Sequence, residues 1–426
     1  MKKASLIIAA AVAGVTGVGA PQVASAQSTL FDVSYKIASA KHDVFARKQK
    51  ERKPFSPAAK TEEEEIVVEE EVVDHSTMDH SQHLAMETSA TDHSQMDHSS
   101  MAHSAHHHGE GMWMFEYRFM RMSMKGMLNG AKEVNPEDLL PPLDSDGMRL
   151  PADQDPYSDF VNADGERETM VSQDMIMDMH MFMAMYAFTD RVTGMIMFNY
   201  LVNEMNMRMQ DLMNPDDPMM ADMYMNMDMY MESSGMGDTQ AGISYKLDNY
   251  FLYNPLFTFL VNIPTGSIDE QDEVNGGKLP YSMQLGTGSY DFTTALSFKS
   301  NYENWGIGAE GSYTWRMKNE ENYSRGDYWR LRGWASYDLN FDPISLTFRG
   351  GIDHTETSEI EGRDENIMEN PMYYGGMRTD LRLGLSLGLP WGFMVESQFA
   401  FPLHEDLHGY QMKTDYMMEF AVQWMF

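Results

Sequence analysis

The sequence predicts an all-β fold, an antiparallel transmembrane β-barrel of about 12 strands preceded by a disordered N-terminal segment. Three observations lead to this prediction. The first 26 residues have the pattern of an export signal, no later apolar stretch is long enough for a spanning helix, and many short segments from residue 111 onward alternate apolar with polar residues. Such alternation lets one face of a strand meet lipid while every backbone group pairs with a neighbouring strand.

The chain divides into four segments by composition. Lys2 and Lys3 precede an apolar run from Leu6 to Val18, and the small residues Ala24-Ser25-Ala26 follow, which is typical of a cleaved signal peptide. A membrane anchor is the alternative, but this run is shorter than the roughly 20 residues that a spanning helix needs. We therefore expect a signal peptide over 1–26, an N-terminal segment with an acidic linker over 27–73, a His/Met-rich tail over 74–110 and the barrel over 111–426.

The overall charge narrows the class of partner. The chain has 65 acidic and 31 basic residues, a net charge of −34, and would repel phosphate backbones, so we expect no nucleic-acid partner. It has no cysteine, which excludes disulfides and thiolate metal sites and leaves methionine as the soft ligand. No phosphate-binding loop, zinc-protease helix or nucleophile elbow is present, and we expect no enzyme activity.

The barrel strands are clearest near the C-terminus. Apolar residues from Tyr416 to Phe426 alternate with polar ones, and five leucines from Leu381 to Leu389 alternate with polar residues and glycine. Upstream, five short links and six long ones alternate, which predicts twelve strands with both ends on the periplasmic side. Arg330, Arg332, Arg349, Arg382 and Glu396 should then face the lumen, and the tail should lie in the periplasm.

The tail offers metal ligands. Residues 74–108 contain nine histidines, and the octet DHSTMDHS at 74–81 returns as DHSQMDHS at 92–99. Imidazole suits Cu(II) and zinc, and thioethers favour Cu(I) or Ag(I), so we expect copper, with silver or zinc as alternatives. A solvated linker is the competing interpretation. The candidate ligands are His75, Met78, His80, His83, His93, Met96, His98, Met101, His103, His106, His107 and His108.

Methionine is concentrated in the first half of the barrel, where 28 of the 43 methionines lie between Met112 and Met236. Six of them, from Met175 to Met185, share one side of a predicted strand, and Asp178 and His180 share the other. If the polar pair faces the lumen, this methionine row faces lipid as a substitute for leucine. The residues expected to face the lumen, as ligands or solute contacts, are Met120, Met122, Met124, His180, Met195, Met197, Met205, Met207 and Met209.

Two resemblances add to these observations. WMFEYRFMRM at 113–122, MYAFTDRVTGMIM at 185–197, SGMGDTQAGISYKL at 234–247, IPTGSIDE from residue 263 and LPYSMQLGTGSYDF at 279–292 resemble the outer-membrane transporters grouped with the meta-pathway of phenol degradation. This resemblance implies an outer-membrane channel for small or aromatic solutes. The tail repeats resemble those of periplasmic copper-resistance proteins, which implies copper binding by the tail.

Together these observations predict an outer-membrane barrel that serves copper or silver export or tolerance. Two alternatives stay open, a diffusion channel for small organic or aromatic solutes and a membrane-tethered metal buffer that transports nothing. The expected partners are outer-membrane lipid, a metal ion and, by family resemblance, the outer-membrane assembly machinery.

Overall fold

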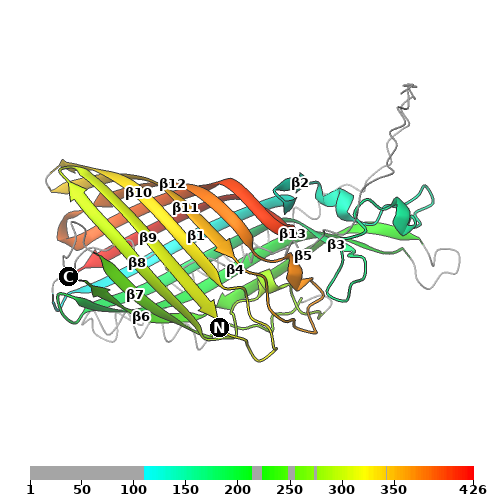
Figure 1. Cartoon of the computed structure of the whole chain (residues 1–426), viewed down its shortest axis with the longest axis horizontal. Helices are drawn as coiled ribbons and strands as arrows, with labels where there is room; N and C mark the ends of the chain where they lie inside the picture. The colour runs from blue at the N-terminus through cyan, green and yellow to red at the C-terminus, as the bar shows by residue number, and fades with distance from the viewer. Residues whose placement is uncertain (1–109, 214–222, 248–254, 273–275, 342) are drawn as a thin grey trace, which may run out of the picture. The chain divides into compact units, whose positions relative to one another are not determined.

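The computed structural model describes residues 110–213, 223–247, 255–272, 276–341 and 343–426, and these form one antiparallel sheet of thirteen strands (Figure 1). The strands are β1 (Trp113–Gly130), β2 (Lys132–Val134), β3 (Met170–Ala187), β4 (Val192–Leu212), β5 (Tyr224–Met236), β6 (Thr239–Lys246), β7 (Leu256–Ile263), β8 (Asp291–Tyr302), β9 (Trp305–Arg316), β10 (Tyr328–Phe341), β11 (Ile344–Thr357), β12 (Gly376–Gly388) and β13 (Phe393–Met425).

The sheet closes into a barrel because β13 pairs with β1 as well as with β12. β13 crosses the wall twice, as a hairpin does. Residues 394–407 pair with β12 and residues 407–425 pair with β1, both antiparallel. The chain reverses near Gly409, whose φ of 67° is a left-handed conformation that suits glycine. β5 and β6 pair in succession with β4 and make one crossing of the wall. β2 pairs only with β1. Twelve antiparallel crossings result, as the sequence predicts.

The connections also follow the predicted alternation. Turns of a few residues join β3 to β4, β8 to β9 and β12 to β13 at one end, whereas long segments join β1 to β3, β7 to β8 and β11 to β12 at the other. We call these the short-turn end and the outer end, because outer-membrane barrels place their long loops outside. The 3-10 helices are η2 (Pro136–Leu139), η3 (Ala152–Gln154), η4 (Tyr281–Met283), η5 (Pro371–Tyr373) and η6 (Pro390–Gly392). No helix among the described residues is long and apolar enough to cross a bilayer.

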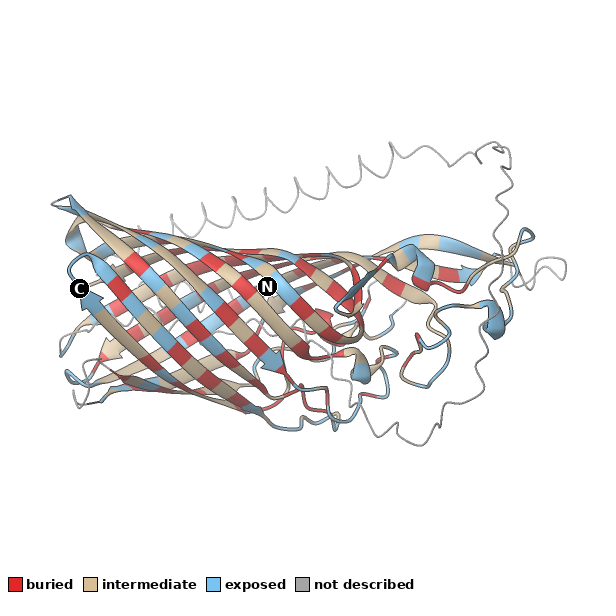
Figure 2. Cartoon of the chain, turned by 45° about the horizontal axis from the view of Figure 1, so that its top comes forward, coloured by how far each residue is buried: buried red, intermediate tan, exposed pale blue. Residues whose placement is uncertain are grey.

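Buried and more exposed residues alternate along the strands (Figure 2), because successive side chains of a strand point to opposite faces of the wall. Leu383, Leu385 and Phe420 are exposed on the outer surface, and Arg330, Arg332, Arg382 and Glu396 are buried inside, which confirms the predicted register of these strands. β4 has 21 residues and β3 has 18, against 8 in β7, so β3, β4 and β5 continue past the outer rim of their neighbours (Figure 1).

The predicted facing of β3 is wrong. Its six methionines from Met175 to Met185 point into the barrel and are at most 9% exposed. Asp178 lies on the outer side, where both of its oxygens accept from Arg121 of β1 at 2.6 Å. His180 is also on the outer side, hydrogen-bonded through Nδ1 to the Tyr117 hydroxyl at 2.9 Å. Polar residues face outward here because each finds a partner on the adjacent strand.

Candidate functional site

One side of the barrel interior is a wall of methionine. Strand register places the side chains of β1, β3, β4 and β5 in rows, of which Met124, Met175, Met205 and Met231 form one. The first three are at most 1% exposed. The methionine wall, as we call it, contains Met114, Met120, Met122, Met124, Met127, Met175, Met177, Met179, Met181, Met183, Met185, Met197, Met205, Met207 and Met231.

Packing within this wall explains why its methionines point into the barrel. The side chains pack on one another and on Leu201, Leu279 and Leu285 in one hydrophobic cluster that fills part of the barrel. Methionine suits such a cluster because its unbranched, three-bond side chain adapts to irregular space. An apolar barrel interior therefore accounts for these residues without a bound metal.

Most of the residues predicted to face the lumen do so. Met120, Met122, Met124, Met197, Met205 and Met207 are buried inside, Met195 packs on the same cluster, and Met209 keeps the inward register of β4 opposite Met170. His180 is the exception, because it lies on the outer face between Tyr117 and Phe119.

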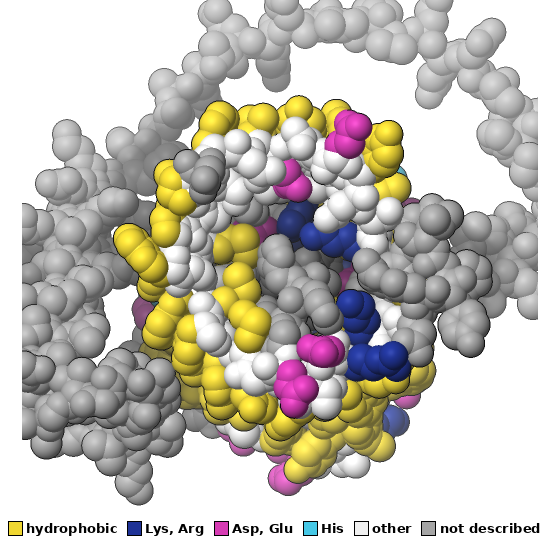
Figure 3. All heavy atoms as spheres, turned by 90° about the vertical axis from the view of Figure 1, so that its left-hand side faces the viewer, with side chains coloured by type: hydrophobic (Ala, Val, Ile, Leu, Met, Phe, Trp, Pro, Cys, Tyr) yellow, Lys and Arg dark blue, Asp and Glu magenta, His cyan; other side chains and the backbone are white. Residues whose placement is uncertain are grey.

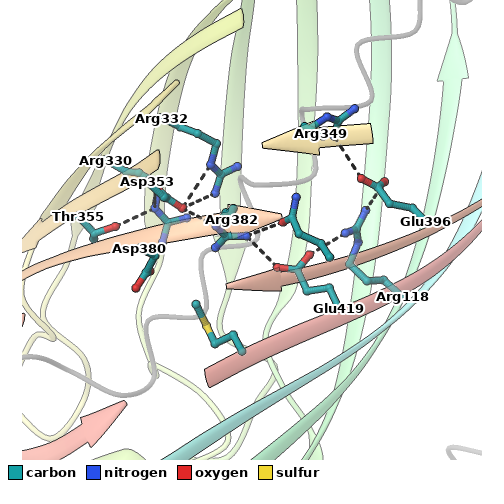
Figure 4. A network of polar contacts seen from close by, with 12 residues as sticks. Arg118, Arg330, Arg332, Arg349, Asp353, Thr355, Asp380, Arg382, Glu396 and Glu419 are labelled. Atoms are coloured by element: carbon teal, nitrogen blue, oxygen red, sulfur yellow. Dashed lines mark hydrogen bonds and ion pairs between the residues drawn. The ribbon is translucent and has the colours of Figure 1, made fainter. Parts of the chain in front are cut away.

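The opposite side of the interior holds an arginine network (Figure 4). The buried carboxylate of Asp353 on β11 forms ion pairs with Arg332 at 2.8 Å, Arg382 at 2.9 Å and Arg330 at 3.4 Å. Arg382 also contacts Glu419 at 3.0 Å, and Glu419 contacts Arg118 at 2.8 Å. Buried charges require such pairing, because an isolated one would lose its hydration without compensation.

The interior is therefore two-sided. β1, β3 and β4 contribute thioethers, and β10, β11 and β12 contribute most of the guanidinium groups. Figure 3 looks into the short-turn end and shows a hollow with hydrophobic side chains along one side and Lys and Arg along the other. A solute in this lumen meets a soft apolar surface on one side and charge on the other.

Three of the family-like sequence motifs meet at one place on the outer rim. Asp238, from the motif at 234–247, accepts the backbone N–H of Gly266 and of Thr287, both at 2.9 Å. It also accepts the amide of Asn262 at 2.8 Å. Gly266 and Gly286 touch so closely that a Cβ on either would collide with the other's backbone. This cluster, which we call the clasp, fixes both ends of the β7–β8 loop to the wall.

The loop held by the clasp folds into the barrel mouth. Tyr281 and Met283 of η4 are fully buried, and the Ser233 hydroxyl of β5 donates to the Met283 carbonyl at 2.6 Å. Tyr281 packs with Tyr323 and Tyr374 from two other long loops in a second hydrophobic cluster. The three loops together form a plug in the outer mouth.

A cavity of about 370 Å³ lies between the plug and the projecting part of the methionine wall. We call it the outer pocket. Its wall side consists of Met127, Met170, Met207 and Met231, its aromatic side of Phe160, Tyr373 and Tyr410, and its plug side includes Lys278 and Leu279. The mixture of thioether and aromatic surface with a few polar groups is typical of a small-molecule site.

Charged groups at the edge of the outer pocket are mostly paired. The Lys278 ammonium lies 2.6 Å from Asp364 and 2.7 Å from Asp269, which ties the β7–β8 loop to the β11–β12 loop. Glu168 also lines the pocket, and burial raises the pKa of this carboxyl although the N–H groups of Thr169 and Met170 donate to it. The polar rim thus presents little unpaired charge to a solute.

The metal ligands predicted in the tail, from His75 to His108, lie outside the described residues, and their metal binding stays a prediction. Within the ranges that the structure describes, no three His, Asp or Glu side chains come together as a metal site.

Comparison with solved structures gives several barrels. An outer membrane channel from Pseudomonas putida F1 matches 75% of this chain and 97% of its own at 13% identity, with a TM-score of 0.48. The match to the toluene transporter TodX of Pseudomonas putida covers 79% of this chain and 95% of that protein, at 11% identity and a TM-score of 0.38. The match to a FadL homologue of Pseudomonas aeruginosa covers 74% of this chain and 89% of that protein, at 10% identity and a TM-score of 0.36. No curated protein matches the sequence.

The family comparison is more specific. A family model matches residues 185–398, half of the chain, and this range contains the motifs that build the clasp. The match corrects the main functional expectation from the sequence, copper or silver export, because the family is described by phenol degradation and nothing in it refers to metal. The channel for organic solutes, which the sequence leaves as an alternative, fits the match better. The chain belongs to the family described as "Putative MetA-pathway of phenol degradation" and is a β-barrel of the Gram-negative outer membrane.

Proposed function

We propose that the protein is an outer-membrane channel for small aromatic solutes, which enter at the outer pocket and move inward along the methionine wall. The observation that carries the proposal is the continuity between the two. Met207 and Met231 line the outer pocket and belong to the same row system as Met124, Met175 and Met205 directly below. The family description supports an aromatic cargo.

The chemistry of the pocket fits such a cargo. An aromatic ring gains from burial on apolar surface, and sulfur at a ring edge adds about 0.3 to 1.5 kcal/mol for each favourable contact. Five methionines and three aromatic rings line a cavity of about 370 Å³. A sugar of similar size gains less from the thioether and aromatic faces, because a hydroxyl group that lies against them loses water without gaining a partner, at about 1 to 3 kcal/mol for each buried group.

The route inward is closed by side chains that can move. Met124, Met175 and Met205 lie below the pocket and are at most 1% exposed, so a solute must displace them. Each of these side chains can change rotamer without moving the backbone. We infer that this row acts as a gate, which opens locally around an aromatic ring and stays closed to water and inorganic ions.

Uptake by porin-deficient Gram-negative cells tests the proposal, because the lipopolysaccharide leaflet slows the entry of apolar solutes. Initial uptake of radiolabelled phenol should rise when the barrel is expressed, and uptake of a hexose should not. Met205→Ile keeps the volume but stiffens the side chain. An off-rotamer cost of about 1 kcal/mol in the barrier should slow phenol uptake about fivefold.

Met418→Ile is the matched control. Met418 lies on the lipid-facing side of β13, beside Phe420, and its replacement should leave uptake unchanged. Folded barrel in the membrane is measured in parallel by heat-modifiable electrophoretic mobility. Equal phenol uptake with and without the barrel would contradict the channel function, and an unchanged rate in Met205→Ile would contradict the gate.

A further inference from the structure

An inward-facing tryptophan lies flat against the arginine side of the lumen. Trp334 is in β10, on the same face as the buried Arg330 and Arg332, and is partly exposed. A Cβ on Gly308 of β9 would collide with the indole ring, and one on Gly351 of β11 would lie 3.0 Å from the Trp334 Cβ. The two glycines let the ring rest on the wall, so that it does not project across the lumen.

Cationic side chains surround this ring. Register places Lys299 of β8 opposite Gly308, and Gly308 opposite Trp334, so the lysine is about 10 Å away along the sheet, within reach of its long side chain. Arg349 of β11 is the diagonal neighbour of Trp334. Arg332, Arg349 and Arg382 line a small hollow together with Trp334, Gly351 and Gln398.

Two of these cations retain unused donors. Arg332 and Arg382 are held by Asp353, and Arg382 also by Glu419. Arg349 has one carboxylate partner, Glu396 at 3.1 Å, and its Nε has no hydrogen-bond partner in the described part of the chain. Among the described residues, no ion pair or hydrogen bond engages Lys299.

The nearby carboxylates leave Lys299 and Arg349 able to bind a further anionic group. Asp338 is the acidic group that acts electrostatically on Lys299, and it already accepts the Thr347 hydroxyl at 2.6 Å. Glu396 is shared between Arg349 at 3.1 Å and Arg118 at 3.9 Å. An indole face with two underused cations beside it is complementary to a planar ring that carries a negative group.

We propose that Trp334, Lys299 and Arg349 form a binding site inside the lumen for small aromatic carboxylates of the benzoate class. The ring stacks on the indole, and the carboxylate accepts from the Lys299 ammonium and from the Arg349 guanidinium. The proposal rests on the channel function above and narrows its cargo. A neutral aromatic solute would use only the indole, and an aliphatic carboxylate only the cations.

Calorimetry on the full-length barrel in detergent micelles tests the site with three probes, benzoate, cyclohexanecarboxylate and acetate. Benzoate should bind more tightly than the other two. Lys299→Gln removes one charge-assisted hydrogen bond and should weaken benzoate binding about tenfold, whereas Lys299→Arg should largely retain it. Trp334→Leu removes the stacking surface and should weaken benzoate about fivefold while leaving acetate unchanged.

Matched controls separate the site from general effects. Trp329→Leu alters a tryptophan of the same strand on the lipid-facing side, and should not change benzoate binding. Because no ion pair or hydrogen bond engages Lys299 in the described part of the chain, its replacement breaks none, so folding should be intact. Equal affinity for benzoate and acetate, or unchanged benzoate affinity in both Lys299→Gln and Trp334→Leu, would overturn the proposal.

Uptake measurements distinguish failure of the site from failure of the channel. If the barrel carries phenol into porin-deficient cells but shows no benzoate binding, the site is wrong and the channel function stands. If benzoate binds as predicted but neither solute is carried, the site stands and the channel function is wrong. Lys299→Gln should lower benzoate uptake and leave phenol uptake unchanged.

Discussion

The arginine network leads to a quantitative prediction for the carboxylate at its centre. Asp353→Asn keeps the shape of the side chain and removes the charge that Arg330, Arg332 and Arg382 share at 3.4, 2.8 and 2.9 Å. Asp353 is only 1% exposed, so water cannot replace it. Removal of one partner from a buried ion pair costs about 3 to 5 kcal/mol, and three cations left together make the upper value the better expectation.

The measurement is the free energy of unfolding of the barrel in lipid vesicles, from urea titration followed by tryptophan fluorescence. Asp415→Asn alters an exposed carboxylate on β13 and is the control, with an expected change of at most about 0.5 kcal/mol. A loss below about 1 kcal/mol in Asp353→Asn, in the range of exposed ion pairs, would refute the reasoning that the network is a buried structural element.

Three further predictions concern the wall and the plug. Leu383→Arg places a charge on the lipid face and should cost about 2 to 4 kcal/mol, seen as a lower yield of membrane-assembled barrel, whereas Ser386→Arg, on the inner face, should assemble normally. Asp238→Ala removes the acceptor of the clasp, so limited proteolysis should cut the β7–β8 loop faster, and equal cutting rates would count against the clasp. Burial alone would raise the pKa of Asp364, but the Lys278 ammonium and the Asn366 amide reverse this and hold that pKa below its usual value. The ion pair therefore stabilises the plug above the ordinary Asp pKa of about 3.9 and loses this effect as pH falls through the lower folded value, so loop cutting by an acid-active protease should rise only at strongly acidic pH.

The sequence is sufficient to predict the barrel because each strand can be recognised from its own alternation of apolar and polar residues. The alternation from Tyr416 to Phe426 and from Leu381 to Leu389 needs only the period of a strand and an apolar solvent. The inward position of Arg332 and Arg382 follows from the same pattern. These features are local, and local patterns can be recognised without knowing which strands are neighbours.

The facing of β3 could not be predicted in this way. Asp178 tolerates the outer face because Arg121, 57 residues earlier, forms a two-bond contact with it. Methionine gives no signal of its own, since the same side chain suits lipid and core. Register between β1 and β3 would have decided the matter, because Phe119 and His180 are opposite each other and Phe119 alternates with Met120, which is predicted to face the lumen.

The plug and the outer pocket were not predicted either. The clasp joins Asp238 with Gly266 and Gly286, from three motifs that the sequence shows only as family-like strings. The glycines are the available signal, because close contact between backbones requires glycine. The inward position of Trp334 could have been derived from its parity with Arg332, but the sequence gives no reason to pair it with Lys299 across β9.

The most direct test of the central claim is to find where an aromatic solute binds in the intact protein. A photoreactive phenol that carries a small diazirine is irradiated with the barrel in outer-membrane vesicles, and labelled peptides are identified by mass spectrometry. We predict labels at Met127, Met207, Met231 and Tyr410 of the outer pocket, which an excess of phenol suppresses. Labels confined to lipid-facing residues such as Phe420, or labels in the pocket that excess phenol does not reduce, would contradict entry of aromatic solutes along the methionine wall.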